Sequence, residues 1–264
     1  MGQPTPAEKQ FLAEEFFQRG KELYQQGNSK RALQEFQKTI RLNPKHAIAY
    51  NNIGMLKLQN AEYREAKDAF AKAVQLDARY ARAYNNLGVI AFMQKNYQLA
   101  IQHYQQAIAA KPRYPEAYFN RGLVYKNQKL YDKAIADFST ALTYNPNFAR
   151  AYTDRAIVKE IRKDYRGALA DYNLAIKVQP NNSAAYYNRA LLKSFFIGDY
   201  SGAVADFDVA IRNNPNSFLA YKYRALSKEK LKDYLGACND FTKFKNLLGR
   251  SSLDLDEKID QYCR

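Results

Sequence analysis

The hydrophobic positions along the chain repeat with two nested periods. Within short stretches, apolar residues recur three and four positions apart, which places them on one face of an α-helix. These stretches themselves recur at an interval of 34 residues. The pattern therefore predicts seven pairs of helices, over residues 13–46, 47–80, 81–114, 115–148, 149–182, 183–217 and 218–251.

Two slots in each repeat indicate how the paired helices pack. The first helix carries a small residue: Gly20, Gly54, Gly88, Gly122, Ala156, Ala190 and Ala225. The second helix carries an aromatic residue: Phe36, Phe70, Tyr104, Phe138, Tyr172, Phe207 and Phe241. A small residue lets two helix backbones approach closely, and the aromatic ring fills the space beside it. Each repeat is therefore expected to form one antiparallel helical hairpin.

The two ends of the repeat array carry signals for capping structure. Residues 1–12 extend the first helix, because Thr5 and Glu8 match a capping box around a proline at the first helical position. Residues 252–264 are expected to form a last helix, capped by Ser251 or Ser252, with Leu255, Ile259 and Tyr262 facing inward. Stacked repeats need such caps to cover their exposed ends.

A charge pattern within the repeats predicts a bridge between the two helices of a pair. Five repeats carry Arg just before the small residue and an acid just before the second-helix aromatic: Arg19 with Glu35, Arg121 with Asp137, Arg155 with Asp171, Arg189 with Asp206, and Arg224 with Asp240. The other two repeats carry neither charge. A partly buried Arg needs such a partner, and its fork fits a carboxylate. In repeat 6 the pair is 17 positions apart instead of 16, which places one extra residue in the turn between its helices.

The segment AYNNLGVIAFMQKNYQLAIQHYQQAIAAKP at 83–112 resembles the tetratricopeptide repeat family, with Tyr in place of its usual Trp. The resemblance covers about nine-tenths of the chain. It implies an all-α, right-handed α-solenoid, in which the first helices line a concave groove. It also implies that this groove binds a protein or peptide.

Under that geometry, three sets of side chains are expected to contact a peptide. An amide series, similar to the asparagine ladder of the tetratricopeptide superhelix in O-linked N-acetylglucosamine transferase, would hold a ligand backbone: Asn52, Asn86, Asn120, Asp154 and Asn188. Neighbouring slots hold Asn51, Asn85, Phe119 and Tyr187. An apolar series would select ligand side chains: Met55, Val89, Phe92, Leu123, Ile157 and Leu191. Arg82 and Arg150 add positive charge to the same surface. An alternative for some of these residues is packing between adjacent repeats.

Composition adds a strong positive charge and little redox chemistry. The chain has 41 Lys and Arg against 26 Asp and Glu, a formal charge of +15, which favours acidic surfaces. Only Cys238 and Cys263 occur, and reduced thiols in a cytoplasmic compartment are the simplest interpretation. The N-terminal residues lack the pattern of a signal peptide, and no stretch has the length and apolarity of a membrane span.

No sequence pattern predicts catalysis, a cofactor or a metal. His46 and His103 fall in different repeats, and the spacings of zinc and phosphate-binding motifs do not occur. The leading hypothesis is a non-enzymatic adaptor, monomeric or weakly self-associating, that binds an extended peptide or helix of a partner. The alternatives are binding of nucleic acid or an acidic surface by the basic outer face, and a scaffold that stacks end to end.

Overall fold

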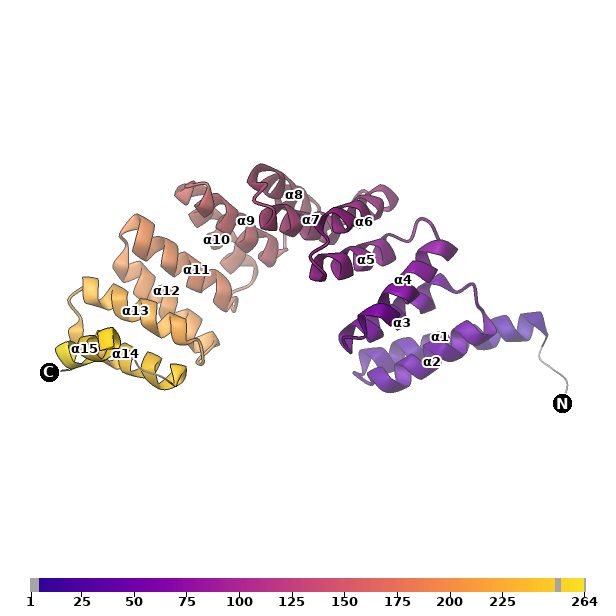
Figure 1. Cartoon of the computed structure of the whole chain (residues 1–264), viewed down its shortest axis with the longest axis horizontal. Helices are drawn as coiled ribbons and strands as arrows, with labels where there is room; N and C mark the ends of the chain where they lie inside the picture. The colour runs from indigo at the N-terminus through magenta and orange to yellow at the C-terminus, as the bar shows by residue number, and fades with distance from the viewer. Residues whose placement is uncertain (1–4, 250–252, 264) are drawn as a thin grey trace. The chain divides into compact units, whose positions relative to one another are not determined.

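The computed structural model describes residues 5–249 and 253–263, and the regular structure in these ranges is helical (Figure 1). The helices are α1 (Pro6–Gln25), α2 (Ser29–Leu42), α3 (Ala47–Gln59), α4 (Tyr63–Leu76), α5 (Ala81–Met93), α6 (Tyr97–Ala110), α7 (Pro115–Asn127), α8 (Tyr131–Tyr144), α9 (Ala149–Ile161), α10 (Tyr165–Val178), α11 (Ser183–Leu192), η1 (Lys193–Ile197), α12 (Tyr200–Asn213), α13 (Phe218–Lys230), α14 (Tyr234–Leu248) and α15 (Leu253–Tyr262). The predicted all-α helical repeat class is confirmed.

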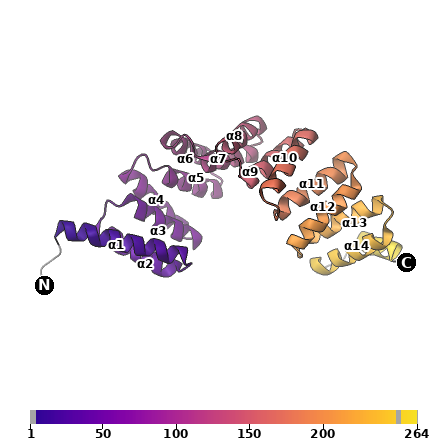
Figure 2. The ribbon, with the colours of Figure 1, turned by 180° about the vertical axis from the view of Figure 1, so that it is seen from behind.

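The chain forms two compact parts, an N-terminal part up to Gln128 and a C-terminal part from Lys129. In the N-terminal part, the helical hairpins are α1 with α2, α3 with α4, and α5 with α6; in the C-terminal part they are α9 with α10, α11 with α12, and α13 with α14 (Figures 1 and 2). First helices of consecutive repeats are also in contact: α3 contacts α5, and α5 contacts α7. This contact forms a continuous first-helix surface within each part.

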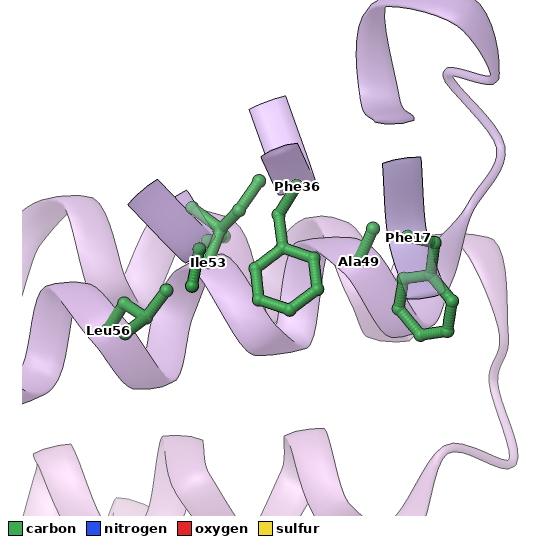
Figure 3. Packing of buried hydrophobic residues seen from close by; sticks show 7 residues of the cluster. Phe17, Phe36, Ala49, Ile53 and Leu56 are labelled. Carbon is green, nitrogen blue, oxygen red and sulfur yellow. The ribbon is translucent and has the colours of Figure 1, made fainter. Parts of the chain in front are cut away.

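The close approach of the two helices explains the small-residue slot. A Cβ atom added to Gly88 would lie 2.5 Å from the ring of Tyr104, so only glycine fits that spacing. In repeat 1 the second-helix aromatic, equivalent to Tyr104, is Phe36. Its ring packs beside Phe17, at 5.8 Å between ring centroids, and beside Ile53 of the next repeat (Figure 3). Each second-helix aromatic is therefore both the core of its hairpin and part of the contact with its neighbour.

Both ends adopt helices where the sequence predicts them. Thr5 and Glu8 form the capping box: the Thr5 amide donates to Glu8 Oε2 at 2.7 Å, and the Glu8 amide donates to Thr5 Oγ1 at 3.3 Å. At the other end, α15 packs Leu255, Ile259 and Tyr262 against Phe241 and Phe244 of repeat 7. The proposed caps Ser251 and Ser252 lie outside the described residues.

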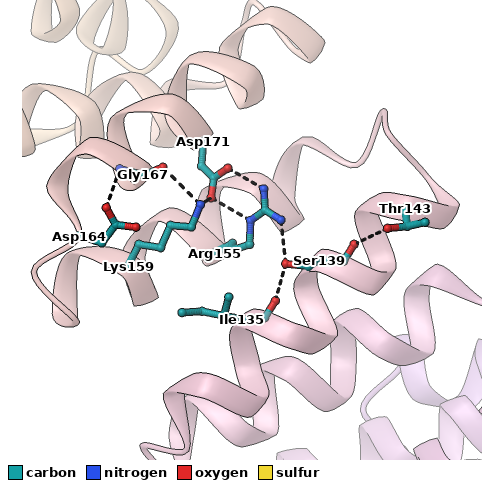
Figure 4. A network of polar contacts seen from close by, with 8 residues as sticks. All are labelled: Ile135, Ser139, Thr143, Arg155, Lys159, Asp164, Gly167 and Asp171. Carbon is teal, nitrogen blue, oxygen red and sulfur yellow. Dashed lines mark hydrogen bonds and ion pairs between the residues drawn. The ribbon is translucent and has the colours of Figure 1, made fainter.

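Three of the five predicted Arg–carboxylate bridges are present, in repeats 5, 6 and 7. Arg155 donates through Nε and Nη2 to both oxygens of Asp171, at 2.8 and 2.7 Å (Figure 4). Arg189 binds Asp206 in the same way, and Arg224 binds Asp240. The carboxylates are buried, so each bridge joins α9 to α10, α11 to α12, or α13 to α14 by charge-assisted hydrogen bonds.

Each of these arginines also reaches the preceding repeat, which the sequence pattern did not predict. The third nitrogen donates to a side chain on the previous second helix: Arg155 to Ser139 at 2.8 Å, Arg189 to Asn173 at 2.7 Å, and Arg224 to Asp208 at 2.7 Å. A single guanidinium therefore joins three helices. This use of all three nitrogens is possible because the guanidinium fork is planar and rigid.

A lysine completes each bridge and was also missed. Lys159 lies 2.8 Å from Asp171, and Lys193 and Lys228 lie 2.9 Å from Asp206 and Asp240. Each lysine follows its arginine by four residues, so both occupy one helix face. A sequence comparison restricted to repeats 5 to 7 would have found it, because the other four repeats place Leu, Lys, Ala and Tyr at this slot.

The remaining two predicted pairs have different outcomes. The bridge from Arg19 to Glu35 is wrong: Glu35 instead binds Lys38 at 2.6 Å, and Arg19 is exposed and lies over the Phe16 ring. Arg121 lies on α7 and Asp137 on α8, in different parts of the chain, and their pairing stays a prediction.

The extra residue of repeat 6 lies between Arg189 and Asp206, as expected, without breaking their bridge. The chain accommodates it in η1, a π-helix that continues α11 and ends at Gly198 with φ of +81°. A single-residue insertion is a usual origin of such a helix. Glycine suits that end because L side chains rarely adopt this left-handed conformation.

The expectation of two reduced thiols is wrong. Cys238, at the start of α14, and Cys263, after α15, form a disulfide across a Cα–Cα distance of 5.3 Å. Two cysteines 25 residues apart do not form a recognisable disulfide pattern in the sequence, whereas the packing of α15 on α14 brings them together. Disulfides are uncommon in reducing compartments, so the cytoplasmic expectation loses the argument on which it was based.

Candidate functional site

The first-helix surface of the N-terminal part contains a pocket of about 380 Å³. It is lined by Phe17, Lys21, Tyr24, Gln25, Phe36, Ile48, Asn52, Met55 and Arg82. The structure thus brings together three residues that the sequence placed in a binding site, namely Asn52, Met55 and Arg82. Lys21 and Arg82 are cations, and the described residues that line the pocket include no carboxylate. The pocket therefore suits an apolar group with a negative charge beside it.

Two members of the amide series each donate a hydrogen bond to an asparagine of the preceding repeat. Asn86 Nδ2 donates to Asn51 Oδ1 at 3.0 Å, and Asn120 Nδ2 donates to Asn85 Oδ1 at 2.9 Å. These bonds link α5 to α3 and α7 to α5. Each bond uses one N–H of a partly exposed amide, whose carbonyl oxygen has no partner among the described residues. Asn52, at the pocket, makes no side-chain hydrogen bond there.

Some of the predicted contact residues are buried, which favours packing between repeats, the alternative that the sequence left open for them. Asn51, Asn85 and Phe119 occupy the slot after the opening aromatic and are buried. Asn51 and Asn85 act there as acceptors for the next repeat. They pack between repeats because this slot faces the neighbouring first helix, which is the alternative left open by the sequence. The half-buried residues Val89, Phe92 and Leu123 remain accessible on the same surface.

The first-helix surface of the C-terminal part carries a group of aromatic rings. The Tyr187 ring lies 6.3 Å from the Tyr223 ring, and Phe195 meets Tyr223 edge to face at 5.6 Å. Burial raises the pKa of Tyr187 to about 12. Tyr223 was not predicted to lie on this surface, because its slot holds an asparagine or aspartate in repeats 2 to 6. Of the other predicted residues, Ile157, Asn188 and Leu191 are half-buried and Arg150 is exposed.

Asp154 is less available to a ligand than predicted. Its side chain is buried, and its Oδ2 atom lies 3.9 Å from Nε of Arg150 on the same helix. The two residues are four positions apart, so they share one face of α9. A cationic ligand would therefore have to compete with Arg150.

Glu160, at the end of α9, is a partly buried carboxylic acid near Tyr172. Its Oε1 atom and the Tyr172 hydroxyl are both buried and without a hydrogen-bond partner in the described structure. Burial raises the pKa of Glu160, and the nearby Tyr172 hydroxyl opposes this shift. The folded state therefore holds the Glu160 proton more strongly than the unfolded state does.

This shift predicts a pH-dependent effect of Glu160→Gln. Because the folded pKa is raised, the wild-type chain loses stability as pH rises from the unfolded value through the folded one. The variant should therefore be more stable at neutral pH, by less than about 1 kcal/mol because solvent still reaches the carboxyl group. The gain should vanish in acid. Urea unfolding at both pH values measures it, with exposed Glu257→Gln as control; equal pH profiles for the two variants would contradict the assignment.

The two histidines have structural contacts. His46 caps α3 by accepting from the Ala49 amide at 3.2 Å and packs on Phe17 at 4.4 Å. His103 contacts Gln106 at 3.0 Å, and burial lowers its pKa. Within the described residues, no three His, Cys, Asp or Glu side chains are grouped as metal ligands. None of the helices in these residues combines the length and the apolar character needed to cross a membrane.

Comparison with known proteins supports the repeat assignment. Tetratricopeptide repeat profiles match residues 51–115 and 115–148, and a further TPR repeat profile matches residues 20–60. No curated protein sequence matches the chain. Several solved structures do resemble it.

A tetratricopeptide repeat protein from Parabacteroides merdae has a TM-score of 0.64 at 21% identity, with 96% of this chain and 99% of that chain covered. PilF of Pseudomonas aeruginosa has a TM-score of 0.71 at 23% identity, covering 85% and 98%. YrrB, described as a TPR protein with an unusual peptide-binding site, has a TM-score of 0.55 at 23% identity, covering 70% and 95%. At these identities the likenesses establish the fold, and the profile matches show that residues 20–148 of the chain consist of tetratricopeptide repeats.

Proposed function

We propose that this chain is a non-enzymatic adaptor that binds an extended segment of a partner protein on its first-helix surface. The observation that carries the proposal is the pocket between α1, α3 and α5. It combines apolar walls at Phe17, Ile48 and Met55 with two cations. Such a combination of an apolar lining and a few convergent polar groups is usual for a binding site.

The polar groups of the pocket suggest how a ligand would be held. The free amide of Asn52 can donate to a backbone carbonyl and accept from a backbone N–H of an extended segment. Lys21 and Arg82 would pair with a carboxylate next to the apolar side chain that fills the pocket. We therefore expect ligands in which a large apolar residue lies beside an acidic residue.

A display selection on the intact chain tests this function. Peptides selected from a random library should be enriched in an apolar residue next to Asp or Glu. Arg82→Ala and Asn52→Ala should each weaken binding of a selected peptide about tenfold or more, since charge-assisted and buried hydrogen bonds are lost. Fluorescence anisotropy measures the dissociation constants.

The control is Arg41→Ala, which removes an exposed arginine of α2 that does not line the pocket. It should leave the affinity unchanged. If selected peptides bind the Arg82 and Asn52 variants as tightly as the wild type, the pocket is not the site. If the selection yields no binder, while DNA or RNA binds with a steep dependence on salt, the basic surface is the functional one.

A further inference from the structure

Repeat 6 exposes an unusual run of apolar side chains at the turn between its helices. Phe195 and Phe196 are each 53% exposed, and Ile197 is 45% exposed. No other three consecutive large apolar residues are exposed in the part of the chain that the structure describes. They lie on η1, the π-helix that the extra residue creates, and π-helical turns often occur at functional sites.

Contacts with the neighbouring repeats hold the two rings in place. Phe196 stacks on Tyr165 of repeat 5 with 4.6 Å between ring centroids. Phe195 turns the other way and meets Tyr223 of repeat 7 edge to face at 5.6 Å. The exposed rings therefore span three repeats along one edge of the C-terminal part. We call this edge, formed by residues 161–166, 195–200 and 230–235, the turn edge.

The two outer turns of the turn edge extend the apolar surface. Ile161 is exposed in the turn of repeat 5, and Leu231, Tyr234 and Leu235 are exposed in that of repeat 7. Exposed apolar side chains that group along one edge in this way are typical of an interaction site, unlike single scattered ones.

Basic residues surround this apolar strip. The turn edge contains five basic residues (Arg162, Lys163, Arg166, Lys230 and Lys232) and three acidic ones (Asp164, Asp199 and Asp233), a net charge of +2. The three aspartates accept hydrogen bonds from the amides of Gly167, Gly202 and Gly236, at 2.8 to 2.9 Å, as helix caps. Lys163, Lys230 and Lys232 are exposed and form no ion pair within the described structure. The strip therefore favours an anionic partner.

We propose that the turn edge docks on an anionic lipid bilayer, with Phe195, Phe196 and Ile197 entering the interface. Lys163, Lys230 and Lys232 would contact the headgroups. Aromatic and aliphatic side chains beside lysines are the combination that peripheral proteins use at membrane surfaces. A fluid interface also accommodates rings that leave one turn in opposite directions, as these two do, whereas a folded protein would need a matching hollow for each.

The absence of tryptophan from the chain allows a direct test. Phe196→Trp introduces a single fluorophore at the centre of the turn edge. Its emission should shift to the blue with vesicles of phosphatidylcholine and phosphatidylglycerol, and not with phosphatidylcholine alone. Leu174→Trp, at an exposed position of α10 outside the turn edge, is the matched control and should not shift.

Vesicle sedimentation separates insertion from simple charge attraction. Replacing Phe195 and Phe196 together by serine should reduce binding to the anionic vesicles about tenfold or more. Replacing the three lysines by glutamine should reduce it on the order of a hundredfold, about fivefold for each lysine. Circular dichroism checks that each variant is folded.

Three results would overturn the proposal. The wild-type chain could fail to bind the anionic vesicles. The double serine variant could bind them as well as the wild type, which would mean that the overall positive charge alone attracts them. The Phe196→Trp emission could stay unshifted while the chain is bound, which would place the turn edge away from the membrane.

Discussion

Replacing Asp171 by asparagine is expected to lower the free energy of unfolding by about 3 kcal/mol. The Asp171 side chain is 2% exposed and pairs with both Arg155 and Lys159. The substitution removes the negative charge of Asp171 and leaves the two cations close together between α9 and α10 (Figure 4). Breaking a buried ion pair on one side costs roughly 3–5 kcal/mol. We expect the lower end, because Arg155 and Lys159 keep side-chain exposures of 17% and 20% and can still reach water.

The matched control for this prediction is Asp132→Asn in the same part of the chain. Asp132 also pairs with an arginine, Arg162, at 3.1 Å, but its side chain is 79% exposed. An exposed pair contributes between about 0 and 1 kcal/mol, so this variant should be nearly neutral. Urea unfolding followed by circular dichroism compares the two. Equal losses in both variants would show that burial of Asp171 is not what matters.

A further variant separates the burial of charge from the loss of a bond. Removing Asp171, Arg155 and Lys159 together, with alanine and two methionines, should cost less than replacing Asp171 alone by asparagine. Replacing a buried ionic group by apolar side chains is often neutral, whereas an unpaired charge is not. Repeat 2 offers a natural parallel, because Ile53 and Ala69 stand in the Arg and Asp slots and are both buried. A triple variant less stable than Asp171→Asn would contradict this account.

The second large effect concerns the C-terminal cap. Cys263→Ser is expected to lower the stability of the cap by about 3 kcal/mol, the chain-entropy value for a loop of this order. The disulfide closes 25 residues and holds α15, a ten-residue helix that is too short to be stable alone. What remains in the variant is the packing of Leu255, Ile259 and Tyr262 on repeat 7 and the ion pairs of Lys245 with Asp256 and Lys258 with Glu229.

Hydrogen exchange localises this second effect. Amides in α15 should exchange faster in Cys263→Ser, while those of α9 and α10 should be unchanged, because repeats contact only their neighbours. Cys238→Ser should give the same result, since either change removes the same bond. Thiol titration of the native chain is an independent check: two titratable thiols under non-reducing conditions would show that the disulfide does not form.

The sequence by itself determined the repeat. Its 34-residue interval predicted helical hairpins, and the glycines facing Phe36, Phe70 and Tyr104 fixed how closely the helices of a hairpin pack, because steric contact between two helices depends on local residue size. The capping box at Thr5 and the bridges in repeats 5 to 7 were also predictable. All of these are contacts within one repeat or one turn, so their spacing along the chain is enough to define them.

Only the tertiary structure decided the contacts between repeats and at the ends. It buried Asn51 and Asn85 under the next first helix, gave each bridging arginine a partner in the preceding repeat, and brought Cys263 to Cys238. It also gathered Lys21, Asn52 and Arg82 from three helices around one pocket. These outcomes depend on the rotation of one hairpin against the next. A sequence period gives the order of the repeats but not that angle. Side chains that line a groove and side chains that are buried between repeats therefore show the same pattern in the sequence, and only the stacked hairpins distinguish them.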